Sequence, residues 1–433
     1  MSATARSSIL STKVVQLCAK QNHSIGVCGA RFAPIGKFAG LVSSFASRRF
    51  YSENGSGAKD KKLFTPGPLG TSPTVKQAML RDLGSRDVEF VETVRYIRSK
   101  LTKIAGVSSS EFTCIPVQGS GTYGVEAVFQ STVPRQNGKV LVFENGAYGK
   151  RLAKICEKMG VDHHVESFPE DDFIDFSRVQ DIVKADNSFT NVAAVHCETS
   201  SGVINPVDQI GGLVETYLPN ATCFVDAMSS FGAVPIDVAA SGIDYIVSSA
   251  NKCVEGVPGF AYVIARIEKL RKCKGFSRSL SLDLVDQYET LETTGQFRFT
   301  PPTHAMLAFR QALDELELEG GVRGRASRYR ENREILKEGM AKLGFKELLD
   351  DRHDGYIITS YHYPKDPKFS FKDFYTRLND KDQVIYPGKV LNADCFRIGN
   401  IGYLKPADMK HLMVCVEEVC KDMGLKMPLD SEG

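Results

Sequence analysis

The stretch SSANKCVEGVPG, residues 248–259, decides how the rest of the chain is interpreted. The apolar, β-branched run 243–247 before it predicts a strand, and the glycines and proline after it predict a turn. Lys252 is therefore expected where a strand gives way to a loop. A single lysine in a loop is most often solvated. A partly desolvated lysine at that position loses its proton more readily and can form a Schiff base with a carbonyl cofactor.

The pattern around this stretch alternates between strands and helices. Strand-like runs occur at 112–117, 140–143, 192–197, 222–225, 243–247 and 260–265, and helical patterns occur at 75–83, 89–104, 123–132, 148–159, 176–185 and 207–217. Such alternation predicts an α/β fold with a mostly parallel sheet flanked by helices. Lysine 252 would then lie at the carboxyl end of one of its strands.

The composition changes after about residue 310. A charged amphipathic helix is expected at 312–343, followed by patterned segments at 356–363 and 371–379 and a last helix at 406–423. We expect a linker and arm at 52–64, a large cofactor-binding domain at 65–310 and a small C-terminal α+β domain at 311–433. The cleft between two such domains is the usual place for a small ligand.

The first 51 residues differ from the rest of the chain. They carry seven Lys and Arg side chains and no acidic residue, and RRFYS at 48–52 resembles a mitochondrial processing site. This composition predicts a transit peptide and a location in the mitochondrial matrix. The formal net charge of the whole chain is +2, so residues 52–433 carry −5 and show no nucleic-acid footprint. No apolar run reaches the roughly 20 residues of a membrane span, and no Cys or His spacing predicts a metal site.

Two further motifs complement Lys252. In VQGSGTY, residues 117–123, a strand leads through glycines into a helix, where backbone N–H groups and the hydroxyls of Ser120 and Thr122 can hold an anion, although a short Gly/Ser turn is also common. Asp226 ends the strand at 222–225, which precedes the strand of Lys252, and a carboxylate there lies at the ligand crevice of an open sheet. An aldehyde-accepting lysine, a phosphate cradle and a carboxylate for a ring nitrogen describe a site for pyridoxal 5'-phosphate (PLP).

Long motifs that match one family of enzymes cover nearly the whole chain after residue 63. They are TPGPLGTSPTVKQAML (65–80), QGSGTYGVEAV (118–128), NGAYGKR (145–151), ETSSGVINP (198–206), DAMSSFGAVPID (226–237), SSANKCVEGVPGFAYVIAR (248–266), KGFSRSLSLDL (274–284), FRFTPPTH (297–304), YPGK (386–389) and DCFRIGNIG (394–402). The chain resembles the class V, fold-type I aminotransferases, and within them the enzymes that act on 2-aminoethylphosphonate and pyruvate.

The resemblance implies a role for each matched residue. Lys252 would be the Schiff-base lysine, Asp226 the partner of the pyridinium nitrogen, and Ser120, Gly121 and Thr122 the phosphate loop. Tyr148 would stack on the cofactor ring, and Thr199 would contact that ring. Thr300 would complete the phosphate site of a partner subunit, which implies a homodimer with shared active sites. Arg397 would bind the substrate carboxylate, because a planar guanidinium matches a carboxylate with two parallel hydrogen bonds.

The implied reaction transfers the amine of 2-aminoethylphosphonate to pyruvate and gives phosphonoacetaldehyde and L-alanine. Arg86 and Arg278 are candidates for binding the phosphonate. An alanine:glyoxylate or serine:pyruvate aminotransferase is the alternative on the same fold, and the phosphonate-type motifs at 248–259 and 274–284 argue against it. A cysteine desulfurase that uses Cys395 and a PLP-binding protein without turnover are two further alternatives.

Overall fold

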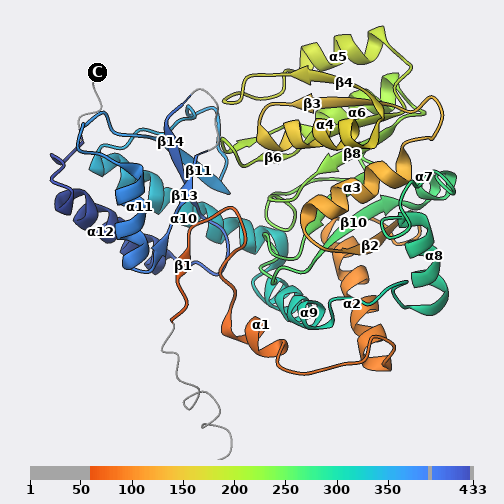
Figure 1. Cartoon of the computed structure of the whole chain (residues 1–433), viewed down its shortest axis with the longest axis horizontal. Helices are drawn as coiled ribbons and strands as arrows, with labels where there is room; N and C mark the ends of the chain where they lie inside the picture. Colours follow the sequence, from red (N-terminus) through yellow and green to blue (C-terminus); the bar gives the residue numbers. More distant parts are fainter. Residues whose placement is uncertain (1–58, 389–392, 430–433) are drawn as a thin grey trace, which may run out of the picture. The chain divides into compact units, whose positions relative to one another are not determined.

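A seven-stranded sheet lies at the centre of the larger part of the chain (Figure 1). Its strand order is β2-β10-β9-β8-β5-β3-β4. The structure is a computed structural model that describes residues 59–388 and 393–429. Neighbouring strands are parallel except in the two pairs that β10 makes. The strands are β2 (Phe112–Gln118), β3 (Lys139–Glu144), β4 (Asp162–Ser167), β5 (Asn191–Val195), β8 (Thr222–Asp226), β9 (Tyr245–Ser249) and β10 (Phe260–Arg266). The predicted α/β fold with a mostly parallel sheet is confirmed.

Burial explains which strands the sequence revealed. Every residue of β5, β8 and β9 is buried, because helices cover a parallel sheet on both faces and its inner strands are continuously apolar. The edge strand β4, with the sequence DHHVES, has no fully buried residue. It was not predicted, because a half-exposed polar edge lacks the apolar run that marks an inner strand.

Helices pack on this sheet and form its apolar core. α3 packs on β2, β9 and β10, α4 packs on β3 and β4, and α6 packs on β5 and β8. Ser72, Asp87, Asp175 and Asp283 each accept a backbone N–H at the start of a helix, which satisfies groups that have no partner within the helix. The helices are α1 (Pro73–Ala78), α2 (Val88–Ile104), α3 (Gly121–Thr132), α4 (Ala147–Met159), α5 (Phe176–Ala185), α6 (Val207–Tyr217), α7 (Ile267–Lys272), α8 (Leu284–Thr294) and α9 (Thr303–Leu318).

A second apolar core forms after α9. It contains a three-stranded antiparallel sheet with the order β11-β14-β13, and helices α10, α11 and α12 pack there (Figure 1, blue). Phe64 also belongs to this core, because β1 (Lys62–Leu63) pairs with β12 (Gln383–Val384). Its other elements are α10 (Gly321–Leu343), β11 (Ile358–His362), α11 (Phe371–Asp380), β13 (Tyr386–Pro387), β14 (Cys395–Gly399) and α12 (Pro406–Asp422).

One predicted element is wrong. The single helix expected at 312–343 is two helices, α9 and α10, which are separated at Glu319 and Gly320. Gly320 and Gly321 have φ values of +100° and +69°, in a left-handed region that glycine adopts without a steric penalty. The glycine pair therefore turns the chain between two helices that share one charged, amphipathic pattern.

Two further observations concern the ends and the surface of the chain. The predicted transit peptide at 1–51 and residues 52–58 of the predicted linker lie outside the described residues, as does Lys389 of the YPGK motif. Within the described ranges, no helix combines the length and the apolar character that crossing a membrane requires.

Candidate active site

Lys252 lies in the turn that follows β9, as the sequence predicts. Its Nζ donates a hydrogen bond to the Pro66 carbonyl at 2.5 Å. Burial lowers the pKa of this lysine to about 8, while the nearby Cys253 and Asp226 side chains act in the opposite direction. A larger share of the amine is therefore neutral near physiological pH than for a solvated lysine, as attack on a carbonyl requires.

The extended arm before α1 closes over this amine. Thr65 Oγ1 donates to the Pro68 carbonyl at 2.7 Å and holds the arm in a tight loop. Gly67, between them, has a φ of +132°, and a Cβ atom there would lie 2.6 Å from Lys252 Nζ. The arm can pass the lysine this closely only because residue 67 has no side chain.

Asp226 ends β8, the neighbour of β9 in the sheet, so both functional side chains leave the carboxyl ends of adjacent parallel strands. Its Oδ1 accepts a hydrogen bond from Met228 N at 2.9 Å. The side chain is buried and makes no ion pair within residues 59–388 and 393–429. Burial raises the pKa of this carboxyl to about 6. A cation placed beside it, such as a protonated ring nitrogen, would reverse that shift.

The predicted phosphate loop lies next to Asp226. A Cβ atom on Gly121 would lie 2.3 Å from Met228 Sδ, so the first residue of α3 packs directly against the residue that hydrogen-bonds Asp226. Ser120 occupies the N-cap position, yet its side chain makes no capping hydrogen bond. The first N–H groups of α3 and this hydroxyl are thus available to an anion, which the helix dipole also favours.

Tyr148 approaches the phosphate loop from another segment. Tyr148 is in the first turn of α4, and its backbone N–H donates to Glu198 Oε2 at 3.0 Å. The Arg151 guanidinium lies 4.7 Å from the centre of the Tyr148 ring, and its Nη1 is 3.4 Å from Thr122 Oγ1. The sequence did not single out Arg151, although it lies within the NGAYGKR motif.

Glu198 is a second residue of the site that the sequence reasoning missed. It is fully buried, and its Oε1 accepts hydrogen bonds from the backbone and the hydroxyl of Ser200, at 3.2 and 2.6 Å. Burial raises its pKa, and these hydrogen bonds act in the opposite direction. The carboxylate therefore fixes the start of α4, where Tyr148 lies. Its position in ETSSGVINP gave no signal of this, because the residues that it caps are about fifty positions earlier.

Arg397 is in β14 and is completely buried. Its Nε donates to the Pro387 carbonyl at 2.8 Å and its Nη1 donates to the Thr199 carbonyl, while the guanidinium lies 4.9 Å from the centre of the Tyr386 ring. Nη2 has no hydrogen-bond partner within the described residues, and no carboxylate there pairs with this cation. Burial lowers its pKa. A buried cation with an unused donor is costly, and a ligand carboxylate would satisfy it.

Three other predicted residues are not brought to this place within one chain. Thr300 is exposed between α8 and α9, and Arg86 is exposed before α2. Arg278 donates to the carbonyls of Val133 and Pro134, at the opposite end of α3 from the phosphate loop. Cys395, the candidate thiol of a desulfurase, is buried in β14 and not on a mobile loop.

The geometry therefore brings Lys252, Asp226, the phosphate loop, Tyr148, Thr199 and Arg397 together from both cores, and residues 74–366 match the family "Aminotransferase class-V". The chain belongs to this family. Relatives include the 2-aminoethylphosphonate–pyruvate transaminases of Salmonella heidelberg and Salmonella typhimurium. Each is 49% identical over 356 residues, which cover 82% of this chain and 96% of the relative.

Solved structures agree with the fold. Ureidoglycine–glyoxylate aminotransferase of Bacillus subtilis has a TM-score of 0.77 at 22% identity and covers 86% of this chain and 95% of its own. Alanine–glyoxylate aminotransferase of Nostoc sp. has a TM-score of 0.77 at 24% identity and covers 87% of this chain and 100% of its own. At these identities the likeness concerns the fold alone.

Family membership decides several of the predictions. It confirms an aminotransferase, and it confirms PLP as the cofactor, which a structural neighbour from Trichomonas vaginalis holds. The described residues fit this cofactor, with a lysine of lowered pKa, an open helix N-terminus and a buried carboxylate that lacks a cation. The predicted mitochondrial location is wrong: relatives that match most of the chain include Salmonella enzymes, and bacteria have no mitochondria. That prediction rested on a basic composition without acidic residues and on the RRFYS segment at 48–52.

Proposed function

We propose that this chain transfers the amine of 2-aminoethylphosphonate to pyruvate and forms phosphonoacetaldehyde and L-alanine. The observation that carries the proposal is 49% identity to transaminases of that name over 96% of their length. The buried Arg397 supports it from the structure, because pyruvate presents a carboxylate and the guanidinium has a donor without a partner.

Each residue of the site has a task in this reaction. Lys252 would hold the cofactor. Once the substrate amine has replaced the lysine, the free lysine amine would move a proton at the substrate carbon as general base and acid. Asp226 would keep the ring nitrogen protonated, and the α3 N-terminus with Ser120 and Thr122 would hold the phosphate. When bound, PLP supplies the electron sink for the pair left at that carbon. Tyr148, with its backbone fixed by Glu198, would cover one face of the ring.

A donor screen tests the proposal. Purified protein loaded with PLP is given 2-aminoethylphosphonate, L-alanine, L-serine or taurine with pyruvate or glyoxylate, and the amino acid product is quantified. We expect rapid alanine formation only from 2-aminoethylphosphonate with pyruvate. Taurine is the matched control, because it replaces the phosphonate with a singly charged sulfonate. Faster use of alanine with glyoxylate, or of serine with pyruvate, would assign the alternative activity to this fold.

We further propose a homodimer in which Thr300 of one copy completes the phosphate site of the other. Thr300 is exposed, and large apolar side chains are exposed near the phosphate loop, Tyr123 at 53% and Phe299 at 45%. Both line one pocket with Gly119, directly before that loop. These are features of a surface that another protein covers.

Mixed dimers test the shared site. Lys252→Ala and Thr300→Arg homodimers should each be inactive. Co-expression should restore activity, because one site of the mixed dimer receives an intact Lys252 and an intact Thr300. Absence of restoration in a mixed dimer confirmed by mass would show that the sites are not shared.

We also propose that the two domains meet within α10. Buried residues of the first core continue as far as Leu316. Apart from Phe64, those of the second core begin at Leu336. A boundary at 310/311 would cut α9, which packs with α1 and α2. The division therefore falls some residues later than the composition suggested.

A further inference from the structure

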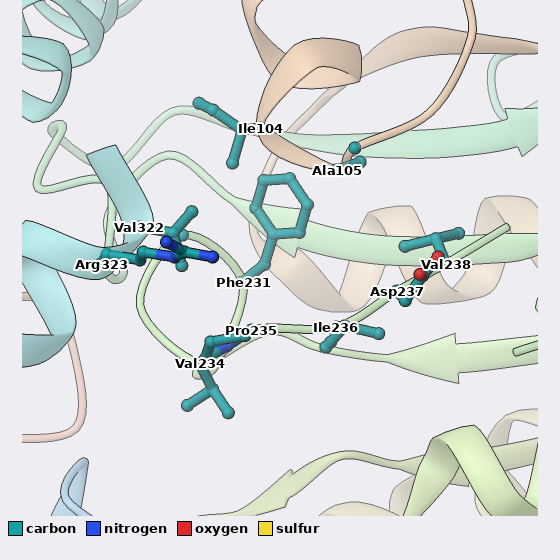
Figure 2. Close-up of a pocket in the computed structure, with 12 residues that line it drawn as sticks. Ile104, Ala105, Phe231, Val234, Pro235, Ile236, Asp237, Val238, Val322 and Arg323 are labelled. Atoms are coloured by element: carbon teal, nitrogen blue, oxygen red, sulfur yellow. The ribbon is translucent and has the colours of Figure 1, made fainter. Parts of the chain in front are cut away.

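Buried charges gather behind the turn that carries Lys252. Glu255 is 4% exposed, and its Oε1 accepts hydrogen bonds from Arg328 Nη2 at 2.7 Å and from the Tyr329 hydroxyl at 2.6 Å. Arg325, which is 1% exposed, lies with its Nη1 3.3 Å from the same oxygen. We call Arg325, Arg328 and Tyr329 the α10 clamp. Val322 and Arg323, in the first turn of α10, instead line the pocket shown in Figure 2.

The clamp also holds the backbone of the lysine turn. Arg325 Nη1 donates to the Cys253 carbonyl, and Glu255 N donates to the Lys252 carbonyl at 2.7 Å. Glu255 has a φ of +65°, a conformation that is uncommon for a residue with a side chain. A residue stays in that region when its surroundings fix it, and here the fixing contacts are those of its own carboxylate.

The same helix face binds the segment that follows the strand of Arg397. The Tyr329 hydroxyl accepts from Gly402 N at 3.1 Å, and Arg328 Nη1 donates to the carbonyls of Gly402 and Leu404 at 2.7 and 2.9 Å. A single set of side chains thus contacts the turn of Lys252 and the loop after β14. Because these charges are buried, the loss of one partner leaves the others unsatisfied.

We propose that Glu255 is a positioning residue that fixes Lys252, through the α10 clamp, relative to Arg397. The inference rests on the roles that the proposed function gives to those two residues. A merely structural network would lower stability when cut and would leave the lysine amine unchanged. A positioning network would instead change the environment and the reach of that amine.

The chain offers variants that separate these cases. Glu255→Gly removes the carboxylate and relieves the backbone, Glu255→Gln keeps an acceptor oxygen, and Tyr329→Phe removes the shared hydroxyl. Glu319→Gln is the matched control. Glu319 pairs with the Nε atoms of Arg325 and Arg328, and its Oε2 also accepts from Arg328 Nη2 at 3.2 Å, the nitrogen that donates to Glu255. No described hydrogen bond or ion pair joins Glu319 to the lysine turn, so its substitution disturbs the clamp without removing a direct contact to that turn.

The first readout needs no cofactor and no reaction. In the full-length apoprotein, competitive acetylation of Lys252 is followed by mass spectrometry against pH. The parent should label with a midpoint near pH 8, and Glu255→Gly should shift the midpoint up by at least about one unit, toward the ordinary lysine value of about 10.4. Asp226, Cys197, Cys253 and Arg151 also act on this amine and are unchanged in every variant. Glu255→Gln and Glu319→Gln should stay near the parent.

The second readout is the rate at which PLP becomes attached to Lys252, trapped with borohydride. We expect Glu255→Gly to be slower by about tenfold to 100-fold, because a displacement of about 1 Å has an effect of that order. An unchanged midpoint and rate in folded Glu255→Gly would overturn the proposal, as would equal shifts in Glu319→Gln. If Glu255→Gly does not fold, Tyr329→Phe is judged by the same criteria. Neither readout involves the amino donor, so failure of the proposed reaction would be seen separately in the donor screen.

Discussion

Lys252 and Pro66, 186 positions apart in the sequence, are joined by a 2.5 Å hydrogen bond from the lysine Nζ to the proline carbonyl. The contact brings the N-terminal arm onto the lysine amine. Phe64, two residues before Pro66, is buried in the second apolar core, and the backbone N–H of Gly399, two residues after Arg397, donates to its carbonyl at 3.0 Å. The arm thus connects Lys252 with the strand that carries Arg397.

The first prediction concerns the arm. Gly67→Ala should reduce attachment of PLP to Lys252 strongly, because φ is +132° and the new methyl group would lie 2.6 Å from Nζ. Gly70→Ala is the control in the same loop, since a Cβ there meets nothing within 4 Å. The measurement is the PLP dissociation constant of both variants together with their unfolding midpoints. Equal cofactor affinity in the two variants would show that the arm is free to move away from the lysine.

The second prediction concerns the pH dependence of Lys252. Burial lowers its pKa to about 8, so half of the amine is neutral at that pH. The rate of PLP attachment to the apoprotein should therefore rise with pH through about 8 and level off above it. Borohydride trapping followed by peptide mapping measures this rate. Lys252→Ala should give no reduced product, and Lys154→Ala, an exposed change on α4, should match the parent. Reduced product at another lysine would contradict the assignment.

The fold was predictable where burial dictates the sequence. The inner strands and α5 and α6 lie where apolar periodicity places them, because each buries a whole strand or one face of a helix. The edge strand β4 and the break between α9 and α10 were missed. The first is polar because it is half exposed, and the second depends on left-handed glycines within a charged segment.

The positions of the candidate site residues were predictable where a motif marks the end of a strand or the start of a helix, as at Lys252, Asp226 and the loop before α3. Contacts between distant segments could not be predicted. Two examples are the hydrogen bond from Lys252 to the Pro66 carbonyl and the cap that Glu198 places on α4. Both depend on tertiary geometry, and the sequence of one partner does not indicate the other. Arg278 shows the same limit, because within one chain this cation of a family-like motif donates to backbone carbonyls at the far end of α3.

The third prediction uses the buried carboxylate of Asp226. Its pKa is raised to about 6 from an ordinary value of 3.8. Between these two pH values the folded apoprotein therefore keeps a proton that the unfolded chain has released. The contribution of this carboxyl to the free energy of unfolding is fully present below about pH 4 and is lost as the pH rises through about 6. The loss is at most about 3 kcal/mol. Asp226→Asn should lack this fall and should unfold at higher temperature than the parent apoprotein at pH 8.

The same variant should lose turnover. An amide cannot keep the ring nitrogen protonated, so we expect kcat to drop by about 100-fold or more while PLP still attaches to Lys252. Asp237→Asn, an exposed carboxylate on the following loop, is the control for both measurements. Near-normal turnover in Asp226→Asn, or a pH profile of stability equal to that of the parent, would make Asp226 a structural residue.

The last prediction separates the two substrates at Arg397. Pyruvate presents a carboxylate beside its ketone, whereas 2-aminoethylphosphonate has no α-carboxylate. Nη2 of Arg397 is buried without a partner, and Nε and Nη1 are already anchored on the carbonyls of Pro387 and Thr199. The guanidinium is therefore held in place before a ligand arrives. Arg397→Lys replaces this fixed, planar donor with a point charge that cannot form the same anchors.

Loss of a charged hydrogen-bonded contact of this kind typically costs about 2 to 5 kcal/mol, roughly a thirtyfold to several-thousandfold effect. We expect Arg397→Lys to impair the pyruvate half-reaction by that factor in a single turnover. Arg377→Lys, a partly exposed change on α11, should leave both half-reactions intact.

If the phosphonate has its own cation, the rate of the 2-aminoethylphosphonate half-reaction should fall much less in Arg397→Lys. Arg151 is then a candidate for that cation, because it contacts Tyr148 and Thr122 and makes no ion pair within the described residues. An equal fall in both halves would show that the two substrates share Arg397, and no fall in either would remove Arg397 from the site.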